Sequence, residues 1–382
     1  LGDLITLKRG YDLPEKDRVS GPYPVISSAG VSGFHNDYKV DGQGVVTGRY
    51  GTLGEMYFVD GKYWPHNTAL YVQNFKGNDP KYIYYLLSCL GRIRTSDKSA
   101  VPGVNRNELH EMAIPAIDDR KLQIAIRKVL EAIDKKIELN NRINAELEAM
   151  AKTLYDYWFV QFDFPDANGK PYKTSGGTLV YNPTLKREIP EGWEATTVGK
   201  ISKTELGGTP STAVDEYWQN ANIPWLSSAE TASFPIITSE QKITQAGIDN
   251  SAATLLPKGT VVISIVRYIR PSILGIDAAT NQSVVGIREC KRLKSSFIYP
   301  YFCSEVPRLM GLRTGAQQPH INKGVIEDSP IVIPCEKVLT DYYKAADPIF
   351  EKIMNLALQS HELMQLRDWL LPMLMNGQVT VK

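Results

Sequence analysis

The sequence predicts an α+β fold in which two strand-rich α/β domains, each followed by a long helix, form an internal repeat. Segment 23–29 (Tyr-Pro-Val-Ile-Ser-Ser-Ala) recurs at 223–229 as Ile-Pro-Trp-Leu-Ser-Ser-Ala, and Gly10 recurs as Gly207. Each half then closes with an Ile-Pro pair and a heptad-patterned segment. This period is far longer than the roughly 20–50 residues of solenoid repeats, so it indicates a duplicated domain plus helix. A length of 382 residues also favours two globular cores.

The first domain is predicted at residues 1–117. Short apolar runs such as 44–47 and 69–72 are separated by Asp-Gly and Gly-Asn turn signals, a pattern typical of strands. One helix is predicted near 80–90, where tyrosines, isoleucine and leucines supply a bulky apolar surface. The composition of this half therefore indicates a strand-rich α/β domain.

The first long helix is predicted at 118–162. No Gly or Pro interrupts residues 119–159, and the apolar spacing changes there to three and four. Heptads sustained over this length predict coiled-coil packing, and at about 1.5 Å per residue the helix is on the order of 60 Å long. The predicted seam consists of Ile126, Val129, Ile133, Ile143, Leu147, Met150, Leu154 and Tyr157, with Lys136 and Asn140 as polar exceptions.

A connector rich in Pro, Gly and Asn occupies residues 163–190 and leads into a second domain at 191–335. Because the connector is not of low complexity, we expect it to make ordered contacts. In the second domain, strands are predicted around 260–266 and 283–287. The helix equivalent to that of the first domain is predicted at 297–310.

The second long helix, with a C-terminal tail, is predicted at 336–382. Pro348 is expected to kink this helix or to mark the start of its main part. The seam of the first helix is preserved here, so the two seams are able to face each other. A shift of 216 residues aligns Ile133 with Ile349, Leu147 with Leu363, Met150 with Leu366 and Leu154 with Leu370.

Composition argues against a membrane protein and against a disulfide-rich one. The chain is 43% hydrophobic and 22% charged, and no apolar run approaches the roughly 20 residues of a membrane span. The four cysteines show no Cys-x-x-Cys spacing, so we expect buried free thiols in a reducing cytoplasm. Leu1 is not an initiator Met, which allows for a natural chain that extends upstream.

A reaction centre is not evident from the residues. The sequence contains no Gly-x-x-x-x-Gly-Lys-Ser/Thr loop, no His-Glu-x-x-His motif, no Gly-x-Ser-x-Gly elbow and no Asn-Pro-Pro-aromatic motif of amino-methyltransferases. Its five histidines lack metal-ligand spacing. We therefore expect a binding protein without catalytic, cofactor or metal residues. Segment 258–323 carries ten basic residues against three acidic ones, so it is a candidate surface for a polyanion although the net charge is only +1.

Four motifs, in order along the chain, resemble the specificity subunit of type I restriction–modification systems. Residues 157–177, which begin Tyr-Trp-Phe-Val-Gln-Phe-Asp-Phe-Pro, resemble that family's central connector, and Ile-Pro-Glu-Gly-Trp at 189–193 resembles the start of its second target-recognition domain. Gly-Ala-Gln-Gln-Pro-His-Ile-Asn at 315–322 resembles the loop before its Ile-Pro pair, and 370–377 resembles its C-terminal ending. The first half departs from the pattern, because 101–105 reads Val-Pro-Gly-Val-Asn and lacks the Gly-x-Gln element.

The resemblance implies a cytoplasmic DNA-recognition subunit with no membrane contact. Two target-recognition domains would each read one half of a bipartite, asymmetric site in double-stranded DNA. The long helices would pair antiparallel as a coiled coil and act as a ruler for the unread spacer. Methyltransferase (modification) subunits and restriction/translocase subunits would dock on the helices. S-adenosylmethionine, ATP and Mg would then be bound by those partners, and the chain itself would be non-catalytic and carry no cofactor.

Candidate DNA-binding residues follow from the chemistry of base and phosphate recognition. Arg pairs with guanine, Asn and Gln pair with adenine, and Lys and Arg also grip phosphates. A glycine beside an arginine allows close backbone approach to a phosphate, although glycines are also routine in hairpin turns. Each candidate also has an ordinary surface or turn role as its alternative. The candidates are Arg49, Tyr50, Lys62, His66, Asn67 and Arg106 in the first domain, and Arg267, Tyr268, Arg270, Gln317, Gln318, His320 and Lys323 in the second.

Two other classes of protein stay open on the sequence alone. One is a coiled-coil adaptor or scaffold whose domains bind a protein or glycan, and salt-dependent binding to duplex DNA distinguishes it from a DNA reader. The other is an autonomous nuclease or methyltransferase, which would cleave DNA or bind S-adenosylmethionine without partners. The recognised sequence, the spacer length and self-association of the isolated chain are not determined by the residues.

Overall fold

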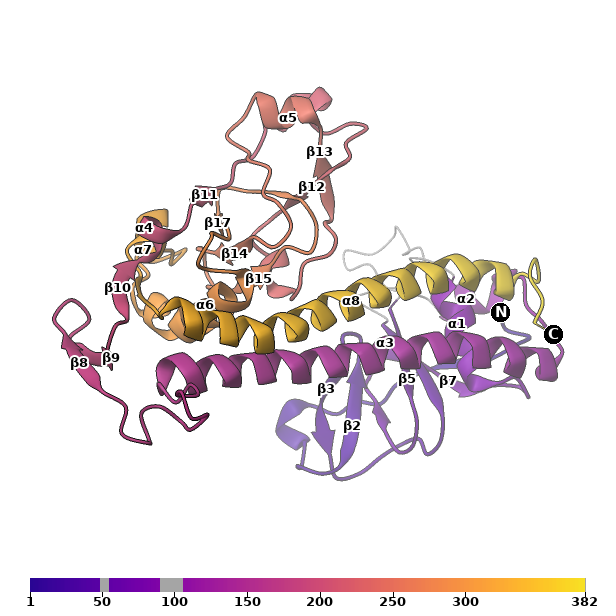
Figure 1. Cartoon of the computed structure of the whole chain (residues 1–382). Helices are drawn as coiled ribbons and strands as arrows, with labels where there is room; N and C mark the ends of the chain where they lie inside the picture. Colours follow the sequence, from indigo (N-terminus) through magenta and orange to yellow (C-terminus); the bar gives the residue numbers. More distant parts are fainter. Residues whose placement is uncertain (49–54, 90–105, 382) are drawn as a thin grey trace. The chain divides into compact units, whose positions relative to one another are not determined.

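The computed structural model describes residues 1–48, 55–89 and 106–381, and it divides into two compact units (Figure 1). The first unit comprises Leu1–Ile137 and Glu362–Lys382, and the second comprises Glu138–His361. Each unit holds one strand-rich domain and a stretch of both long helices, α3 and α8, whose bounds are Arg120–Tyr155 and Glu336–Met375. The predicted fold class, two strand-rich domains with a long helix pair, is confirmed.

The first domain consists of two small sheets with strand orders β1-β7-β4-β5 and β3-β2-β6. The four-stranded sheet is antiparallel, whereas β2 and β6 pair in parallel. Predicted strands at 44–47 and 69–72 and the helix near 80–90 are present. The elements are β1 (Thr6–Arg9), η1 (Glu15–Asp17), β2 (Tyr23–Ser27), β3 (Gly30–His35), β4 (Gly44–Gly48), β5 (Met56–Val59), β6 (Trp64–Pro65), β7 (Ala69–Asn74), α1 (Pro80–Cys89) and α2 (Arg106–Glu111).

The second domain repeats this topology strand for strand. Its sheets have the orders β11-β17-β14-β15 and β13-β12-β16, again with one parallel pair, β12 with β16. Helices α6 and α7 take the places of α1 and α2. The elements are α4 (Val198–Ile201), β11 (Thr204–Leu206), η3 (Asp215–Tyr217), β12 (Ile223–Leu226), η4 (Glu230–Ala232), β13 (Gln241–Ile243), α5 (Gln245–Asp249), β14 (Val261–Ser264), β15 (Pro271–Ile273), β16 (Ala279–Thr280), β17 (Val284–Ile287), α6 (Ser295–Gly311) and α7 (Lys323–Glu327), with β10 (Glu194–Thr197) paired to β18 (Pro330–Ile333).

The repeated glycine marks the same backbone crossing in both domains. A Cβ at Gly10 would overlap the carbonyl oxygen of His66, and a Cβ at Gly207 would overlap that of Thr280. Both obstacles lie at the end of the parallel strand of the smaller sheet: His66 directly follows β6, and Thr280 is the last residue of β16. Only a residue without a side chain permits this close approach, which explains why Gly recurs there.

The connector is ordered, as expected from its composition. Phe164 stacks on Tyr172 at 4.6 Å between ring centroids and on Trp193 at 5.0 Å. The Asp163 carboxylate accepts hydrogen bonds from the backbone and side chain of Thr174, and these bonds lower the pKa of Asp163. The π-helix η2 (Asp156–Val160) precedes the connector, and the hairpin of β8 (Leu179–Asn182) and β9 (Arg187–Pro190) ends it. The connector is therefore part of the second unit's core.

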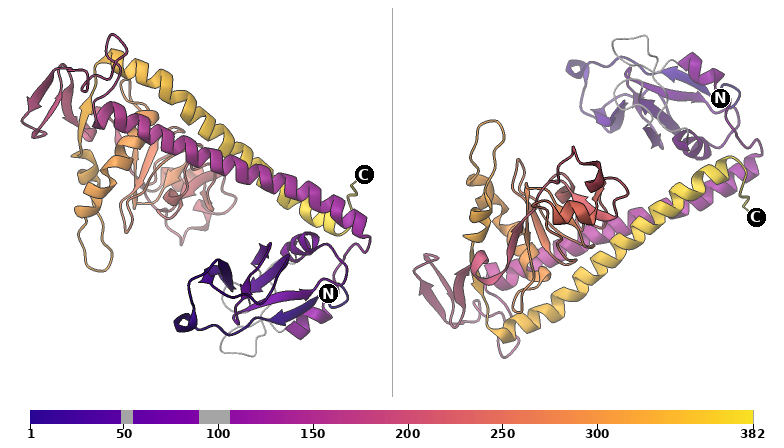
Figure 2. Two further views of the ribbon diagram at one scale, coloured as in Figure 1. Left: turned by 90° about the horizontal axis from the view of Figure 1, so that it is seen from below. Right: turned by 90° about the horizontal axis from the view of Figure 1, so that it is seen from above.

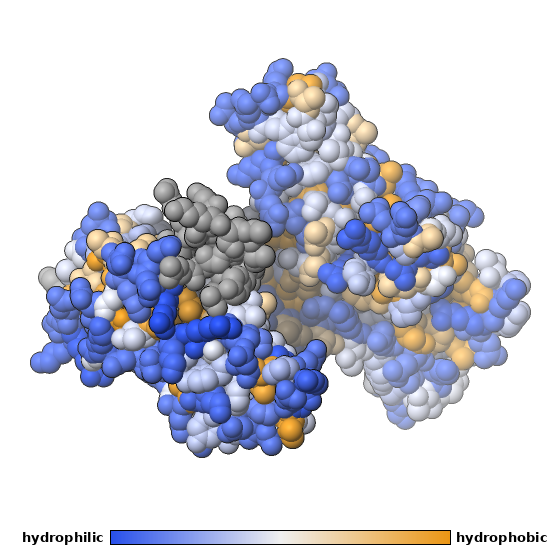
Figure 3. Space-filling view, turned by 180° about the vertical axis from the view of Figure 1, so that it is seen from behind, coloured by the Kyte–Doolittle hydropathy of each residue, from blue (hydrophilic) through white to orange (hydrophobic). Residues whose placement is uncertain are grey.

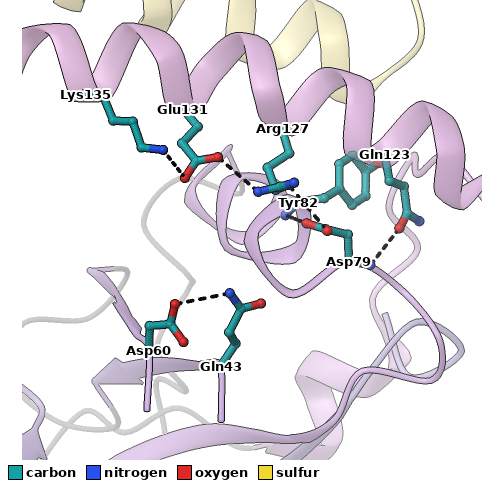
Figure 4. A network of polar contacts seen from close by, with 8 residues as sticks. All are labelled: Gln43, Asp60, Asp79, Tyr82, Gln123, Arg127, Glu131 and Lys135. Carbon is teal, nitrogen blue, oxygen red and sulfur yellow. Dashed lines mark hydrogen bonds and ion pairs between the residues drawn. The ribbon is translucent and has the colours of Figure 1, made fainter.

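In the first unit, the domain is fixed to α3 by a polar network at the start of α1 (Figure 4). The Asp79 carboxylate accepts from the backbone N–H of Tyr82 at 2.9 Å and lies 3.4 Å from the Arg127 guanidinium. Gln123 accepts from the Asp79 backbone N–H at 2.9 Å. Glu131 pairs with Arg127 at 3.0 Å along α3. Because Asp79 is buried, the hydrogen bonds to its carboxylate and from its backbone N–H satisfy groups that water does not reach.

The seam of α3 differs from the prediction at every second position. Ile126 and Asn140 are buried as predicted, but Leu130 is buried in place of Val129, and Ala151 in place of Met150. Met150 is 57% exposed. The prediction favours Met150 because methionine is the larger apolar side chain. The observed seam instead follows an unbroken alternation of four and three residues, and this alternation includes Ala151.

Helices α3 and α8 run antiparallel. Within the second unit, the Asn140 side-chain amide donates to the Gln359 side-chain oxygen at 2.9 Å, and that of Asn144 donates to the Ile353 carbonyl at 3.2 Å. Rising numbers in one helix therefore meet falling numbers in the other, and both views in Figure 2 show the helices side by side. Pro348 lies inside α8, so it does not mark the helix start.

The close approach at Gly207 yields a stability prediction. Gly207→Ala is expected to lower the free energy of unfolding by about 1–3 kcal/mol, because the added methyl group displaces backbone rather than a mobile side chain. Thermal denaturation measures the effect. Gly311→Ala is the matched control, since nothing lies within 4 Å of its added Cβ. Equal stability of the two variants would contradict the proposed reason for the repeated glycine.

Candidate nucleic-acid interface

The second domain brings the two basic candidate segments together. Residues 265–270 connect β14 to β15, and residues 312–322 connect α6 to α7. The backbone N–H of Arg267 donates to the Pro319 carbonyl at 2.9 Å, and that of Ile321 donates to the Ile265 carbonyl at 3.0 Å. We call residues 265–270 and 313–321 the paired loops. Segments about fifty residues apart in sequence thus share one surface.

The paired loops stand on an apolar base. Ile265, Ile269 and Ile321 are buried in the core of the second unit. Arg267 has a left-handed backbone with φ of 60°, and its carbonyl oxygen accepts a hydrogen bond from the Arg313 guanidinium, which also donates to Met310. The backbone that carries the exposed side chains is consequently held by the buried isoleucines and by the hydrogen bonds of the Arg313 guanidinium.

The exposed residues of the paired loops are donors and amides. Tyr268 is 61% exposed, and the Arg270 guanidinium lies over its ring at 5.0 Å from the centroid. Gln317, Gln318 and His320 are exposed, and His320 Nδ1 lies 3.0 Å from the Gln318 carbonyl oxygen. Among the described residues, no carboxylate lies within 4.0 Å of Arg267, Arg270 or Arg313. The surface therefore presents positive charge together with amides.

Several other cations of the basic segment are paired with carboxylates that its local charge count omits. Lys323 pairs with Glu327 at 3.0 Å within α7. Its charge is therefore compensated, unlike the charges of the arginines in the paired loops. Acidic partners from elsewhere in the chain meet Arg288, Arg292 and Lys294. Three of the cations in 258–323 that make no ion pair among the described residues therefore lie in the paired loops, and Lys258 and Lys291 lie outside them. The partner carboxylates are Glu205 for Arg288, Glu194 for Arg292 and Asp347 for Lys294.

Arg49 and Tyr50 lie outside the described residues. In the sequence they follow β4, as Arg267 and Tyr268 follow β14. The segment between α1 and α2, likewise, occupies the chain position of the loop between α6 and α7. The first-domain counterparts of both paired loops are thus identified by position alone.

Lys62 and Arg106 occupy separate places in the first domain. The Lys62 ammonium lies 4.5 Å from the centroid of the Tyr38 ring and 3.9 Å from the Asp41 carboxylate. Its hydrogen bond with Tyr38 raises the pKa of Lys62, so the group stays cationic. Arg106 begins α2 and is exposed. No contact among the described residues links these two side chains.

His66 and Asn67 sit together at the turn between β6 and β7. His66 Nδ1 lies 3.0 Å from the Thr68 hydroxyl oxygen, and burial lowers the pKa of His66. The imidazole is therefore predominantly neutral near pH 7. The Asn67 amide donates to the Asp12 carboxylate. Both residues have structural partners, which makes them weaker candidates than the residues of the paired loops.

Sequence reasoning missed Arg313 as a site residue. Arg313 is one of the ten basic residues of segment 258–323. Its position two residues before Gly315, in the same loop as Gln317, is the signal that places it beside the candidates.

The described residues contain no group of three or more His, Cys, Asp or Glu arranged to hold a metal ion. Cys335 is exposed and the other three cysteines are half-buried, contrary to the expectation of buried thiols. No helix in the described part of the chain is both long and apolar enough to cross a membrane.

Fold and surface together define a class: an internally duplicated, two-domain binding protein whose exposed loops carry cations and amides. The family model for the type I restriction modification DNA specificity domain matches residues 1–149 and again residues 190–338. The chain belongs to this family. It is a specificity subunit of a type I restriction–modification system with two target-recognition domains.

Individual relatives agree with the family match. The chain is 28% identical to the type I restriction enzyme MjaIX specificity subunit of Methanocaldococcus jannaschii, over 81% of this chain and 73% of that one. It is 22% identical to the HindI specificity subunit of Haemophilus influenzae, over 78% and 77%. The crystal structure of an S subunit from M. genitalium shares the fold, with a TM-score of 0.58, 14% identity and coverage of 98% and 94%.

The contacts of Arg313 yield a prediction about the paired loops. Arg313→Ala is expected to speed amide hydrogen exchange at Arg267 and Ile321 several-fold, because the carbonyl of Arg267 loses its donor and the loops open more often. Hydrogen–deuterium exchange with mass spectrometry resolves the two peptides. Arg308→Ala is a control on the preceding helix, where the guanidinium pairs with Glu305 instead. Unchanged exchange in both loops would show that Arg313 does not hold them.

Proposed function

We propose that the two target-recognition domains each read one half of a bipartite, asymmetric site in double-stranded DNA. The observation that carries this proposal is the pairing of Arg267, Tyr268 and Arg270 with Gln317 and Gln318 on one exposed surface. Arginine and glutamine are the side chains that form bidentate contacts with guanine and adenine in the major groove. The strand orders of the two domains match, and the chain segments at the corresponding positions of the first domain differ in sequence.

Within the surface, distinct roles follow from the contacts. Arg270 lies over Tyr268, so the pair offers a planar cation beside an exposed ring, an arrangement suited to a phosphate or a base edge. Gln317 and Gln318 project from the other loop and supply both a donor and an acceptor. We assign sequence reading to the glutamines and Arg267, and phosphate contact to Arg270. Lys323, which is paired with Glu327, has a lesser part.

In this proposal the chain is non-catalytic and acts in the cytoplasm. Methyl transfer and cleavage belong to partner subunits, which would carry S-adenosylmethionine, ATP and Mg. The adaptor alternative has less support, because the family match covers both domains. Antiparallel α3 and α8 would set the length of the unread spacer between the half-sites, since paired helices resist bending more than a flexible linker does.

Substitution of the paired loops tests DNA recognition. In the complex assembled with its methyltransferase subunits, Arg267→Ala and Arg270→Ala are each expected to weaken binding to target duplex about tenfold. Loss of a phosphate contact also reduces the slope of log affinity against log salt by about 1. Fluorescence anisotropy at several salt concentrations measures both quantities.

Lys258→Ala is the matched control for this experiment. Lys258 is an exposed cation that precedes β14, whereas the paired loops follow that strand. It is expected to leave affinity within about twofold, since only long-range charge is lost. If the Lys258 and Arg267 variants lose the same affinity, net charge rather than the paired loops accounts for binding.

We also propose that methyltransferase subunits dock on an apolar surface present in each unit. Leu366 and Trp369 are exposed on α8 in the first unit, and Trp369 is 63% exposed. In the second unit, Met150 is exposed near the end of α3, and Tyr157 and Val160 are exposed on the π-helix that follows it. The 216-residue shift aligns Met150 with Leu366. Large apolar side chains that are exposed, such as Trp369, favour contact with protein partners. The face drawn in Figure 3 is mainly hydrophilic, with apolar residues in small separate patches.

Trp369→Ala tests this docking surface. Two related patches predict two bound methyltransferase subunits, so the variant is expected to lose one of them, because buried tryptophans commonly dominate interface affinity. Native mass spectrometry or light scattering of the mixed subunits gives the stoichiometry. Lys352→Ala, an exposed change elsewhere on α8, serves as control. Retention of both partners at wild-type affinity by the Trp369 variant would place the docking surface elsewhere.

A further inference from the structure

Polar side chains interrupt the apolar seam between α3 and α8 within the second unit. Asn140 and Ser360 are buried, and the amides of Asn140 and Asn144 donate to Gln359 and to the Ile353 carbonyl. Even so, three buried polar atoms, Asn140 Oδ1, Asn144 Oδ1 and Ser360 Oγ, have no hydrogen-bond partner in the described part of the chain. We call Asn140, Asn144 and Ser360 the polar layer.

Stability does not account for the polar layer. A buried polar atom without a partner is destabilising, and an apolar side chain of similar size is usually tolerated as well or better. The internal repeat supplies the comparison, because the 216-residue shift aligns Asn140 with Leu356, a buried apolar residue. Asn144 aligns with Ser360, so that position is polar in both copies. The polar layer is therefore retained against a cost in stability.

The aliphatic part of the seam discriminates poorly between registers, because sliding one helix past the other by seven residues again places apolar side chains on apolar ones. Such a slip would also separate Trp158 and Phe159 from Tyr342, whose rings meet at 5.6 and 4.7 Å between centroids. A polar layer opposes such a slip, because it would move unpaired amides against aliphatic groups. Asp134 and Arg367 add a cross-helix ion pair in the first unit at 3.1 Å, but both side chains are partly exposed and such pairs contribute little.

We propose that Asn140, Asn144 and Ser360 are positioning residues that fix the register of α3 against α8 and thereby the spacer length that the subunit accepts. The inference rests on the proposed reading of a bipartite DNA site. One heptad of slip corresponds to about 10 Å along a helix, which equals about three base pairs of duplex. Loss of the polar layer therefore allows the subunit to accept spacers that differ from the native one by steps of about three base pairs.

The test compares spacer choice in complexes assembled with the partner subunits. Wild-type complex is first given duplexes in which the recognised half-sites are separated by the native spacer or by spacers up to about four base pairs shorter or longer. Asn140→Leu, alone and with Ser360→Ala, is expected to reduce discrimination between the native spacer and one altered by about three base pairs at least tenfold. The melting midpoint of these variants is expected to equal or exceed that of wild type, because unpaired buried atoms are removed.

Asn141→Leu is the matched control, since it makes the same change at the next residue of α3, which is exposed. It is expected to keep the wild-type spacer. Ser360→Ala alone removes a single oxygen and covers the case in which Asn140→Leu does not fold. It is expected to relax spacer choice by a smaller factor.

The outcomes separate the two proposals. If wild-type complex shows no bipartite site with a preferred spacer, the proposed function fails. If it shows one, and a folded Asn140→Leu/Ser360→Ala variant keeps the same spacer with undiminished discrimination, the register inference is overturned. A variant that is less stable than wild type yet still accepts a single spacer would show instead that the polar layer is a structural element only.

Discussion

Burial of the seam between α3 and α8 is the constraint on which the rest of the structure depends. Neither helix can leave its apolar stripe in water, and each domain is built against the stretch of helix that its own unit contains. In the first unit Asp79 joins α1 to α3 through Arg127 and Gln123. In the second, Tyr342 of α8 donates to the Ser296 carbonyl at the start of α6. Domain and helix therefore fold as one cooperative body within each unit.

In the duplicated domains, the residues that maintain the architecture are different from the residues whose chemistry is free to vary. Strand orders, the parallel pair and the crossing at Gly10 and Gly207 are the same in both copies. Those features are backbone interactions, which constrain geometry but place few demands on side chains. The loops after β4 and β14 differ in sequence, and it is there that two half-sites of different sequence would be told apart. Asymmetry of the target then follows from asymmetry of loops on a symmetric frame.

Much of this organisation could be predicted from the sequence, because it rests on local signals. Short apolar runs between turn signals located β4 and β7, and the absence of Gly and Pro located α3. Features that depend on tertiary partners are harder to predict from the sequence. Ala151 is buried and Met150 exposed because helix phase overrides side-chain size, and Lys294 is neutralised by Asp347 from a distant part of the chain. The resemblance of four motifs to a known family supplied the antiparallel pairing, which residue patterns alone left open.

The way the paired loops are held has an evolutionary consequence. Their mutual contacts are made by backbone N–H and carbonyl groups of Arg267, Pro319, Ile265 and Ile321, and their anchors are buried isoleucines. Exchange of the exposed side chains at Tyr268, Gln317 or Gln318 therefore leaves these bonds intact. Loop sequences can thus change at these positions without loss of the contacts that hold the loops, and under the proposed function each change would alter the surface presented to DNA.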